Sequence, residues 1–556
     1  MESVTHILLI KAQQGDVDAQ AELAWKYYEG DGPATSKADA LKWFRVAASN
    51  GNAGAQCKLG EMYLMGHGVP KNSTLAWKWF RASAGQGNVS AQYGIGWMYA
   101  NGIGGPINND EALKWFHWSA KRGHDDAKYF LGRMYENGNG VPKDFIEAAR
   151  WYRMAAAKGL ARAQFSLGRM YENGNGVPKD FIEAARWYRM AAADGHGGAQ
   201  LSLGLMYYHG TGARQNSQKA VKWLRMAAEK GSAAAQNALG QMYASGDGLP
   251  VDKAEAAKLF LKAAEQGNAH AQLRLGMVYY EGDGLPKDAA KALKWLRKSA
   301  EQGITSAQLM LSEIYEEGKS VKQDAAKALK WLRIAAEHGA IHAQYNLGVR
   351  YYHGTDVRKN FPNAVKWFQM AAEKGYSSAE NMLGVMYEAG EGVPKDAVEA
   401  VRWYRSSAEG GHAMGQYNLG EMYFNGTGVK EDVSEAMKWY RLSAKLGHPD
   451  AQFSLGWIYY HGHGVPRDHI EAVKWFRESA LNGDIDSQYW LGVIYANGEG
   501  VPKDYTRAHA WWNIAGAKGY QKAKTELGAL EKAMTPEQKA EAMTVARELF
   551  EKLPKE

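Results

Sequence analysis

Three histidines in the segment HGHGVPRDH, at positions 461, 463 and 469, are the side chains best placed to bind a metal ion. A protein metal site needs three or four ligands in a defined geometry. Two of the three fall in a variable loop, and no cysteine accompanies them. His461 also shares its place in a 36-residue period with His209 and His353, which indicates ordinary variation between repeats. We therefore expect no metal site.

Other signatures of catalysis are missing from the sequence. The single cysteine, Cys57, allows neither a disulfide nor a cysteine-based zinc site within one chain. The many Gly-x-Gly turns lack the preceding strand and the Gly-Lys-Ser or third-glycine element of a nucleotide loop. No Ser–His–Asp or Cys–His–Asp arrangement rises above the repeat background. We predict no catalytic residue, no cofactor and a protein that is not an enzyme.

Charge and hydropathy limit the class of partner. The chain has 67 Lys and Arg against 60 Asp and Glu, a net charge of +7 that is weak for 556 residues. A nucleic-acid reader usually concentrates basic residues on one face, so we expect no nucleic-acid partner. The N-terminus lacks the basic start and the apolar run of a signal peptide, and no run approaches 18 apolar residues. We expect no membrane insertion, and a cytoplasmic chain as written or a periplasmic one if a leader was removed.

A Leu-Gly pair reveals the elements that must position any functional side chain. Its glycine recurs without insertion or deletion on a 36-residue grid, at Gly60, Gly96, Gly132, Gly168, Gly204, Gly240, Gly276, Gly348, Gly384, Gly420, Gly456, Gly492 and Gly528. Ala24 and Ser312 occupy the two remaining grid points. A period of this length is typical of stacked repeat units.

Each unit begins with one amphipathic helix, which we call helix A. In the unit 163–198, Ala163, Leu167, Met170 and Tyr171 lie on one helical face. The tyrosine recurs in all units from Tyr27 to Tyr495, which predicts a packed ring with a satisfied hydroxyl. A Gly-x-Gly turn and a Val-Pro pair then end the helix.

A second helix, helix B, follows an N-cap residue. The cap positions are Ser36, Asn72, Asn108, Asp144, Asp180, Asn216, Asp252, Asp288, Asp324, Asn360, Asp396, Asp432, Asp468 and Asp504. A glutamate three residues on predicts a capping box at Glu111, Glu147, Glu183, Glu255, Glu399, Glu435 and Glu471. A tryptophan recurs on helix B at 13 of 14 points, Trp43 to Trp511, and we predict that it fills the gap between helices. A glycine such as Gly195 ends helix B.

These patterns predict an all-α solenoid of 36-residue helix-turn-helix repeats, because a single hairpin cannot bury its apolar face alone. We assign residues 1–18 to an N-terminal capping helix, 19–522 to fourteen repeats in one solenoid, and 523–556 to C-terminal capping helices. In the last helix, which opens at Thr535-Pro536, we expect Met543, Ala546 and Phe550 to face inward.

The unit AQxxLGxMYxxGxGVPxDxxEAxxWxRxAAxxG resembles the Sel-1-like repeat family, a relative of tetratricopeptide repeats. The resemblance covers nearly the whole chain and implies a right-handed superhelix that serves as a scaffold or adaptor, with helix A lining the concave surface. The glycine-rich loops favour a bacterial origin. One branch of the family carries paired cysteines and is linked to β-lactam binding or hydrolysis, and this chain lacks those cysteines.

The variable positions of helix A carry aromatic residues that could anchor a protein partner. We predict partner binding by Trp25, Tyr28, Tyr93, Trp97, Tyr417, Phe424, Phe453, Trp457, Tyr460, Tyr489 and Trp490, mainly in units 415–522. The alternative is that these rings fill gaps between adjacent helices A. A Lys or Arg stands before the tryptophan position of helix B at 13 of 14 points, and an Arg stands two after it at ten. These residues predict helix-spaced ion pairs such as Glu183–Arg186 and Arg225–Glu229 on a solvated face.

The function that this pattern favours is a non-catalytic scaffold that binds a protein or peptide in the concave groove. Two alternatives stay open. One is a β-lactam-binding or β-lactam-hydrolysing enzyme, which the missing cysteines disfavour. The other is an immunity or inhibitor protein that blocks a toxin. The sequence leaves self-association undetermined.

Overall fold

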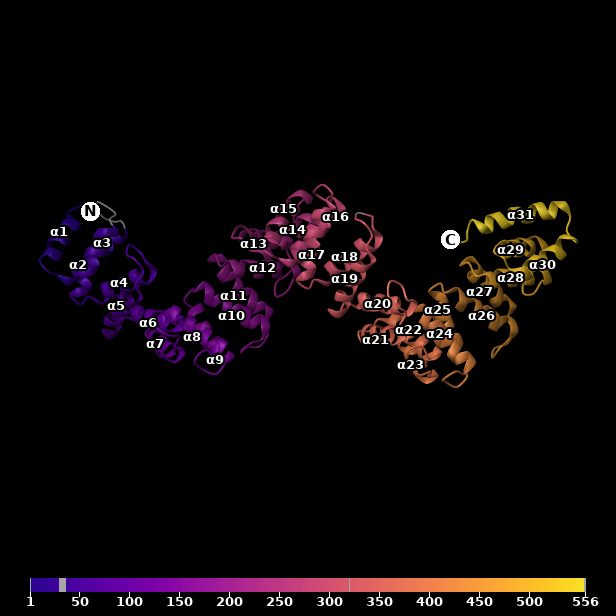
Figure 1. Cartoon of the computed structure of the whole chain (residues 1–556), viewed down its shortest axis with the longest axis horizontal. Coiled ribbons are helices and arrows are strands. Elements are labelled where there is room, and N and C mark those ends of the chain that lie inside the picture. The colour runs from indigo at the N-terminus through magenta and orange to yellow at the C-terminus, as the bar shows by residue number, and fades with distance from the viewer. Residues whose placement is uncertain (1, 30–36, 320, 555–556) are drawn as a thin grey trace. The chain divides into compact units, whose positions relative to one another are not determined.

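The computed structural model describes residues 2–29, 37–319 and 321–554 of the chain (Figure 1). Over these residues it contains 31 α-helices and no strand. The helices A are α2 (Val17–Glu29), α4 (Ala53–Met65), α6 (Val89–Asn101), α8 (Asp125–Asn137), α10 (Ala161–Asn173), α12 (Gly197–His209), α14 (Ala233–Ser245), α16 (Ala269–Glu281), α18 (Thr305–Glu317), α20 (Ile341–His353), α22 (Ser377–Ala389), α24 (Ala413–Asn425), α26 (Pro449–His461) and α28 (Ile485–Asn497). The helices B are α3 (Lys37–Ser49), α5 (Ser73–Gly85), α7 (Asn109–Lys121), α9 (Phe145–Ala156), α11 (Phe181–Ala193), α13 (Ser217–Glu229), α15 (Lys253–Glu265), α17 (Ala289–Glu301), α19 (Ala325–Glu337), α21 (Phe361–Ala372), α23 (Ala397–Glu409), α25 (Val433–Lys445), α27 (His469–Leu481) and α29 (Tyr505–Ala517). Three terminal helices complete the chain: α1 (Glu2–Gln13), α30 (Gln521–Glu531) and α31 (Pro536–Phe550).

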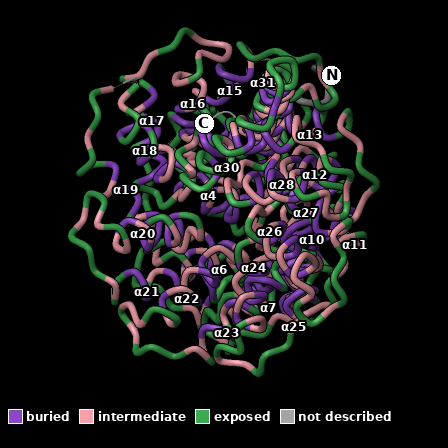
Figure 2. The backbone as a smooth tube through the Cα atoms, turned by 90° about the vertical axis from the view of Figure 1, so that its right-hand side faces the viewer, coloured by how far each residue is buried: buried purple, intermediate pink, exposed green. Residues whose placement is uncertain are grey.

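The predicted all-α array of helix-turn-helix repeats is confirmed. The chain divides into two compact units, Met1–Trp295 and Leu296–Glu556. Within each unit, consecutive helices pack against one another, so that a helix A contacts its own helix B and the helix B before it. Buried residues lie along the helices and exposed residues gather in the loops that join them (Figure 2). The handedness of a superhelix stays a prediction.

The helix ends follow the predicted signals. Gly174, for example, ends α10 with a positive φ of 76° and returns its N–H to the Met170 carbonyl. Thirteen predicted N-caps of helix B, Asn72 to Asp504, accept a backbone N–H, whereas Ser36 lies outside the described residues. Local sequence therefore sets the boundaries of the hairpins.

The seven glutamates expected to complete capping boxes have another role. Each pairs with the Lys or Arg three residues on, as Glu183 does with Arg186 at 3.3 Å. The capping-box prediction for these residues is therefore wrong, because a nearby cation competes for the carboxylate. The box predicted at Thr535 and Gln538 does form, at the start of α31.

The largest fully buried side chains lie mostly at one position, directly after the tryptophan position of helix B, which we call the deep position. It is at most 4% exposed in every repeat: Phe44, Phe80, Phe116, Tyr152, Tyr188, Leu224, Phe260, Leu296, Leu332, Phe368, Tyr404, Tyr440, Phe476 and Trp512. Most of the recurring tryptophans, such as Trp439, are only half-buried and pack against the edge of this core. The prediction that the tryptophan fills the gap between helices is therefore wrong in most repeats, because the next residue along helix B fills it instead.

The glycine of the Leu-Gly pair leaves room for the side chain at the deep position. A Cβ atom at Gly420 would lie 2.6 Å from Cε1 of Tyr440, twenty residues later, and one at Gly456 would lie 2.7 Å from Cδ1 of Phe476. Normal carbon–carbon contacts are about 3.5–4.0 Å. The glycine that recurs every 36 residues therefore marks the place where helix B packs most closely on the helix A of the same repeat.

Adjacent repeats are joined by two recurring polar contacts. A buried glutamine of helix A donates its Nε2 to a carbonyl at the end of the preceding helix B, as Gln416 does to Ala408 at 3.2 Å. The helix-B arginine donates to the tyrosine hydroxyl of the next repeat, as Arg441 does to Tyr459 at 2.8 Å. The predicted satisfied hydroxyl is confirmed in these repeats. Arg225 likewise bonds Tyr243, so its predicted pair with Glu229 is replaced by a contact between repeats.

The two ends of the array differ from the inner repeats. At the N-terminus, Ala12 of α1 joins Leu23 of α2 in a small core. At the C-terminus, α31 folds back against α29 and buries Ala542 and Ala546. Met543 and Phe550 are 52% and 60% exposed. Their predicted inward orientation is wrong, since α29 meets the face of α31 that carries the small alanines.

Candidate functional site

The helix-A face carries pockets at equivalent places between successive helices A. Each pocket has the deep residue of the intervening helix B as its floor. One pocket of about 360 Å³ lies between α14 and α16 over Phe260. Another of about 360 Å³ lies between α18 and α20 over Leu332. A third of about 200 Å³ lies between α24 and α26 over Tyr440. Because the repeat is regular, these pockets share one backbone frame and differ in their side chains.

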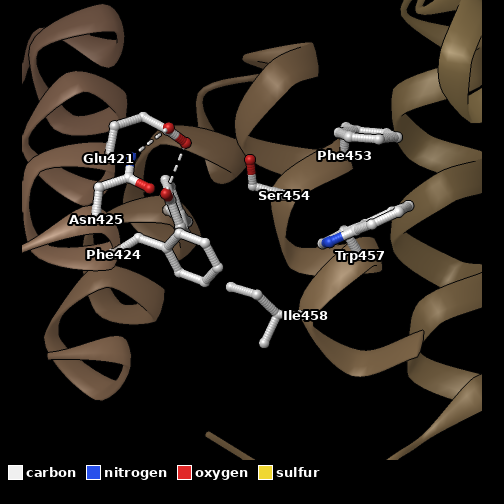
Figure 3. Close-up of a pocket in the computed structure, with 8 residues that line it drawn as sticks. Glu421, Phe424, Asn425, Phe453, Ser454, Trp457 and Ile458 are labelled. Atoms are coloured by element: carbon white, nitrogen blue, oxygen red, sulfur yellow. Dashed lines mark hydrogen bonds between the residues drawn. The ribbon is translucent and has the colours of Figure 1, made fainter. Parts of the chain in front are cut away.

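The pocket between α24 and α26, which we call the Tyr440 pocket, has mainly apolar walls (Figure 3). It is lined by Glu421, Phe424, Asn425, Tyr440, Phe453, Ser454, Trp457 and Ile458. Figure 3 shows the Glu421 carboxylate and the Phe424 ring on one side and Trp457 on the other. Three residues predicted to bind a partner, Phe424, Phe453 and Trp457, are thus brought together around one cavity.

A partly buried hydrogen bond fixes the carboxylate of the Tyr440 pocket. The Tyr440 hydroxyl donates to Oε1 of Glu421 at 2.7 Å, and Nδ2 of Asn425 donates to Oε2 at 3.3 Å. Burial, together with the charge of Glu421, raises the pKa of Tyr440, so the hydroxyl keeps its proton. The carboxylate is held at the rim with lone pairs left for a ligand, since an ionised carboxylate has about four acceptor sites.

An aromatic cluster continues from the pocket to α28. Trp457 lies 6.0 Å from Phe453, 4.0 Å from His461 and 5.2 Å from Trp490, measured between ring centroids. Tyr460 lies 5.2 Å from Trp490 and donates its hydroxyl to Oε2 of Glu499 at 2.5 Å. All of these rings are half-buried, so each keeps an accessible part. The cluster therefore forms an anchored aromatic surface rather than a set of free side chains.

The remaining predicted anchors at the C-terminal end lie on either side of this surface. Tyr417 stacks on His448 at 5.0 Å and lies 5.9 Å from Tyr440. Tyr489 lies 5.1 Å from Tyr520. His448 and Tyr520 directly precede α26 and α30, so these two rings also serve packing where each repeat joins the following helix.

The four predicted N-terminal anchors form two separate groups. Trp25 and Tyr28 pack edge-to-face, 5.9 Å apart, and both contact Phe44. Lys58 lies over both rings. Tyr93 stacks on His124 at 4.6 Å, and Trp97 packs partly buried against two cores. The first group is already covered by a side chain of the protein itself.

Sequence reasoning missed the polar members of the Tyr440 pocket. A pairing rule within the chain would not have found Glu421, because that rule joins residues sixteen apart, whereas Glu421 lies nineteen residues before Tyr440 and Phe424 stands sixteen before it. Three other deep tyrosines each donate to a glutamate of the same repeat, in the pairs Tyr152–Glu136, Tyr188–Glu172 and Tyr404–Glu388. Ser454 and Ile458 line the pocket only because α26 stacks beside α24, which no local signal indicates.

The other two pockets are lined by more charged residues. The pocket over Phe260 includes Arg274 and Glu281. The pocket over Leu332 holds the buried Arg350, which pairs with Glu316 at 2.6 Å and with Asp356 at 2.5 Å. In the pocket over Leu332, the charge of Arg350 is thus neutralised by two carboxylates of the protein itself. The Tyr440 pocket instead combines apolar walls with one carboxylate.

His461, His463 and His469 do not form a group of three metal ligands, although the His461 and His463 rings lie 5.8 Å apart. His461 packs on Trp457, and His469 lies 3.9 Å from Glu499. Burial, with the positive charges of His463 and Arg467, lowers the pKa of His461. Within the described residues, no group of three or more His, Cys, Asp or Glu side chains could hold a metal ion.

Across residues 2–29, 37–319 and 321–554, no helix has both the length and the apolar composition needed to span a membrane.

Comparison with known proteins gave consistent matches. The family model described as Sel1 repeat matches fourteen consecutive segments between residues 17 and 520. The crystal structure of c5321, a protective antigen of uropathogenic Escherichia coli with an SLR fold, is similar at 34% identity and a TM-score of 0.59, over 85% of this chain and 94% of that one. A Sel1 repeat protein from Oxalobacter formigenes is 35% identical over 56% of this chain and 90% of its own, with a TM-score of 0.46. The comparison with curated proteins found no match.

Proposed function

Because this chain belongs to the Sel1 repeat family, whose members generally mediate protein interactions, we propose that it is a non-catalytic scaffold that binds a protein or peptide on its helix-A face. The partner is anchored at the Tyr440 pocket and along the aromatic surface of Phe453, Trp457, Tyr460 and Trp490. The single observation that carries this proposal is the pocket itself, which joins three half-buried aromatic rings to a fixed carboxylate.

Several features of the pocket support an interaction site. Hot spots of protein interfaces are rich in Trp, Tyr and Arg and lie in well-packed pockets from which water is excluded on binding. Trp457 is held by Phe453, His461 and Trp490, so little side-chain entropy is lost on binding. Pre-organised rings of this kind bind more strongly than mobile ones.

The chemistry of Cys57 argues against the enzymatic alternative. Its side chain is buried, and burial raises the pKa of the thiol to about 12. A thiol nucleophile requires a thiolate, which forms readily only at a lowered pKa. We therefore expect no turnover of the β-lactam nitrocefin by the purified chain. Hydrolysis above the rate in buffer would contradict the non-catalytic proposal.

We also propose that residues 1–18 and 523–556 act as terminal caps on the fourteen repeats of 19–522. In support, Ala12 of α1 and Ala542 of α31 are buried in the hydrophobic clusters of the first and last hairpins. A repeat array needs such caps because its end units would otherwise expose their apolar faces.

Affinity capture with a matched pair of variants tests the proposed site. The tagged wild-type chain, the Trp457→Ala variant and the Trp118→Ala variant are used to capture partners, which are quantified by mass spectrometry. Trp118 is 51% exposed on the helix B α7 and serves as the control. We expect Trp457→Ala to lose partners that Trp118→Ala retains, by about thirty-fold in affinity for a hot spot of about 2 kcal/mol. Equal capture by both folded variants would contradict the site.

A toxin captured in this way would identify the chain as an immunity or inhibitor protein, which is one form of the proposed binding function.

A further inference from the structure

Charge is divided unequally between the two helix layers near the Tyr440 pocket. The helices A of the last four repeats, α22, α24, α26 and α28, contain no Lys or Arg. Their charged residues are the carboxylates Glu380, Glu388, Glu421, Asp450 and Asp486. The basic residues of these repeats lie on the helices B, as Arg402, Arg405, Lys438, Arg441, Lys445, Lys474, Arg477 and Arg507, and in the loops that join helix A to helix B, as Lys395, Lys430, Arg467 and Lys503. The helix-A face is therefore complementary to a positively charged partner.

The first two repeats show what can occupy the equivalent space. Between α2 and α4, Nζ of Lys58 lies 4.3 Å from the Tyr28 ring centroid and 5.1 Å from that of Trp25. The same ammonium bonds Glu61 at 3.0 Å. The Lys58 side chain is only 14% exposed. Although its burial favours the neutral amine, the contacts with Glu61 and Tyr28 outweigh this and raise the pKa of Lys58, so it stays charged.

The Tyr440 pocket contains the same groups but lacks the lysine. In the 36-residue register, Ser454 takes the place of Lys58, and Phe424 takes the place of Tyr28. The carboxylate and the indole are exchanged: Glu421 stands at the Trp25 position and Trp457 at the Glu61 position. The pocket of about 200 Å³ is the space that the shorter serine leaves open. The ammonium of Lys58 therefore occupies the cation position between α2 and α4, whereas the equivalent position in the Tyr440 pocket holds no cation from the described residues.

From this comparison we propose that the Tyr440 pocket binds a lysine or arginine side chain from a basic peptide segment of the partner. This inference rests on the proposed function and adds the chemistry of its ligand. The aliphatic stem lies against Phe424, Trp457 and Ile458, and the cationic head bonds the Glu421 carboxylate and the Ser454 hydroxyl. Cation–π attraction and a charge-assisted hydrogen bond act together in such a site.

Three labelled nonapeptides test the inference by fluorescence polarisation. They share the sequence Gly-Leu-X-Phe-Gly-Leu-X-Phe-Gly, with lysine, glutamine or glutamate at X. We expect the wild-type chain to bind the lysine peptide at least about ten-fold more tightly than the glutamine peptide, and the glutamate peptide most weakly. The preference should decrease as the salt concentration rises, because part of it is electrostatic.

Two variants of the pocket separate charge from shape. Glu421→Gln should weaken binding of the lysine peptide about ten-fold and leave the glutamine peptide unchanged. Ser454→Lys reproduces the residue found at position 58 and should abolish lysine-peptide binding in a fully folded chain. Leu442→Lys is the control, because residue 442 is 38% exposed on α25 and the equivalent positions 262 and 298 already carry lysine. This control should bind like the wild type.

Each outcome decides the inference. Equal affinity for the three peptides, no binding of the lysine peptide, or unchanged lysine-peptide binding by Ser454→Lys would overturn it. If Trp457→Ala still loses the captured partner in that case, the proposed site stands and only the preference for a cation falls. Loss of lysine-peptide binding in the Leu442→Lys control would also overturn the inference, since it would show attraction to the overall charge.

Discussion

Replacement of Gly420 by alanine is the sharpest test of how the repeat is built. The added Cβ would lie 2.6 Å from Cε1 and 2.7 Å from Cδ1 of Tyr440, which is 1% exposed. The ring has to move by about 1 Å to reach a normal contact distance. That movement also stretches the bond from the Tyr440 hydroxyl to Glu421, which is now 2.7 Å long.

The expected loss of stability follows from three effects. Overpacking of a core costs about 1–3 kcal/mol. Weakening a hydrogen bond to a charged group costs about 1.5–3 kcal/mol when it is lost completely. Replacing glycine by alanine inside a helix restores about 1 kcal/mol. We expect Gly420→Ala to destabilise α24 and α25 by about 2–3 kcal/mol.

Ala24 shows why the anchored hydroxyl matters. It occupies the same grid position in the first repeat, opposite Phe44. Phenylalanine has no hydroxyl to hold in place, so its ring can shift as a whole. The double variant Gly420→Ala with Tyr440→Phe should therefore be less destabilised than the sum of the two single variants, which a double-mutant cycle measures.

Hydrogen exchange with mass spectrometry measures the effect locally, which suits an array that need not unfold as one unit. Protection of α24 and α25 should fall by roughly thirty- to 150-fold. Gly528→Ala is the control, because Gly528 lies on the same grid with nothing within 4 Å of a Cβ. It should gain about 1 kcal/mol. A gain of stability in Gly420→Ala as well would refute the explanation of the Leu-Gly motif.

Three further predictions concern other parts of the array. Nδ1 of His412 accepts the Gly415 N–H at 3.2 Å, and burial, followed by the charge of His448, lowers the pKa of His412. The folded state therefore binds fewer protons at His412 than the unfolded state does. The stabilisation that the neutral His412 cap gives to folding is complete above a pH of about 6.5 and is lost as the pH falls below it. His412→Asn, which copies the Asn88 cap, should remove part of the acid sensitivity of α24 in hydrogen exchange, and an unchanged pH dependence would contradict this. The buried Oε1 of Gln164 has no partner in the described structure, whereas Gln452 accepts from Asn482 at 2.9 Å. Asp194→Asn should supply the missing donor and stabilise the folded state by about 1 kcal/mol, as measured by thermal unfolding. The control is Lys158→Asn in the preceding, nearly identical repeat, where Lys128 stands at the position of Gln164. This variant should give no gain, because a lysine has no acceptor atom. Phe550→Lys should change stability by less than about 0.5 kcal/mol, and Ala546→Lys should melt α31 at lower temperature because it buries a charge. Equal melting of these last two variants would show that the observed orientation of α31 is wrong.

The sequence alone determined the repeat and its boundaries. The 36-residue spacing, the N-caps such as Asp180 and the terminating glycines such as Gly174 act within a few residues of the chain. Their hydrogen bonds are local, so residue type and position predict them. The family and the helix-turn-helix class followed from this same pattern, and the aromatic positions of helix A were visible for the same reason.

Only the tertiary structure decided which side chain enters the core and where a pocket opens. Trp439 and Tyr440 are neighbours that point about 100° apart on one helix, and the sequence ranks the larger tryptophan first. The close approach of Gly420 selects Tyr440 instead. Phe424 and Trp457 meet across one cavity because α26 stacks beside α24. Such contacts depend on how helices pack, and helical periodicity gives a face but not its neighbour.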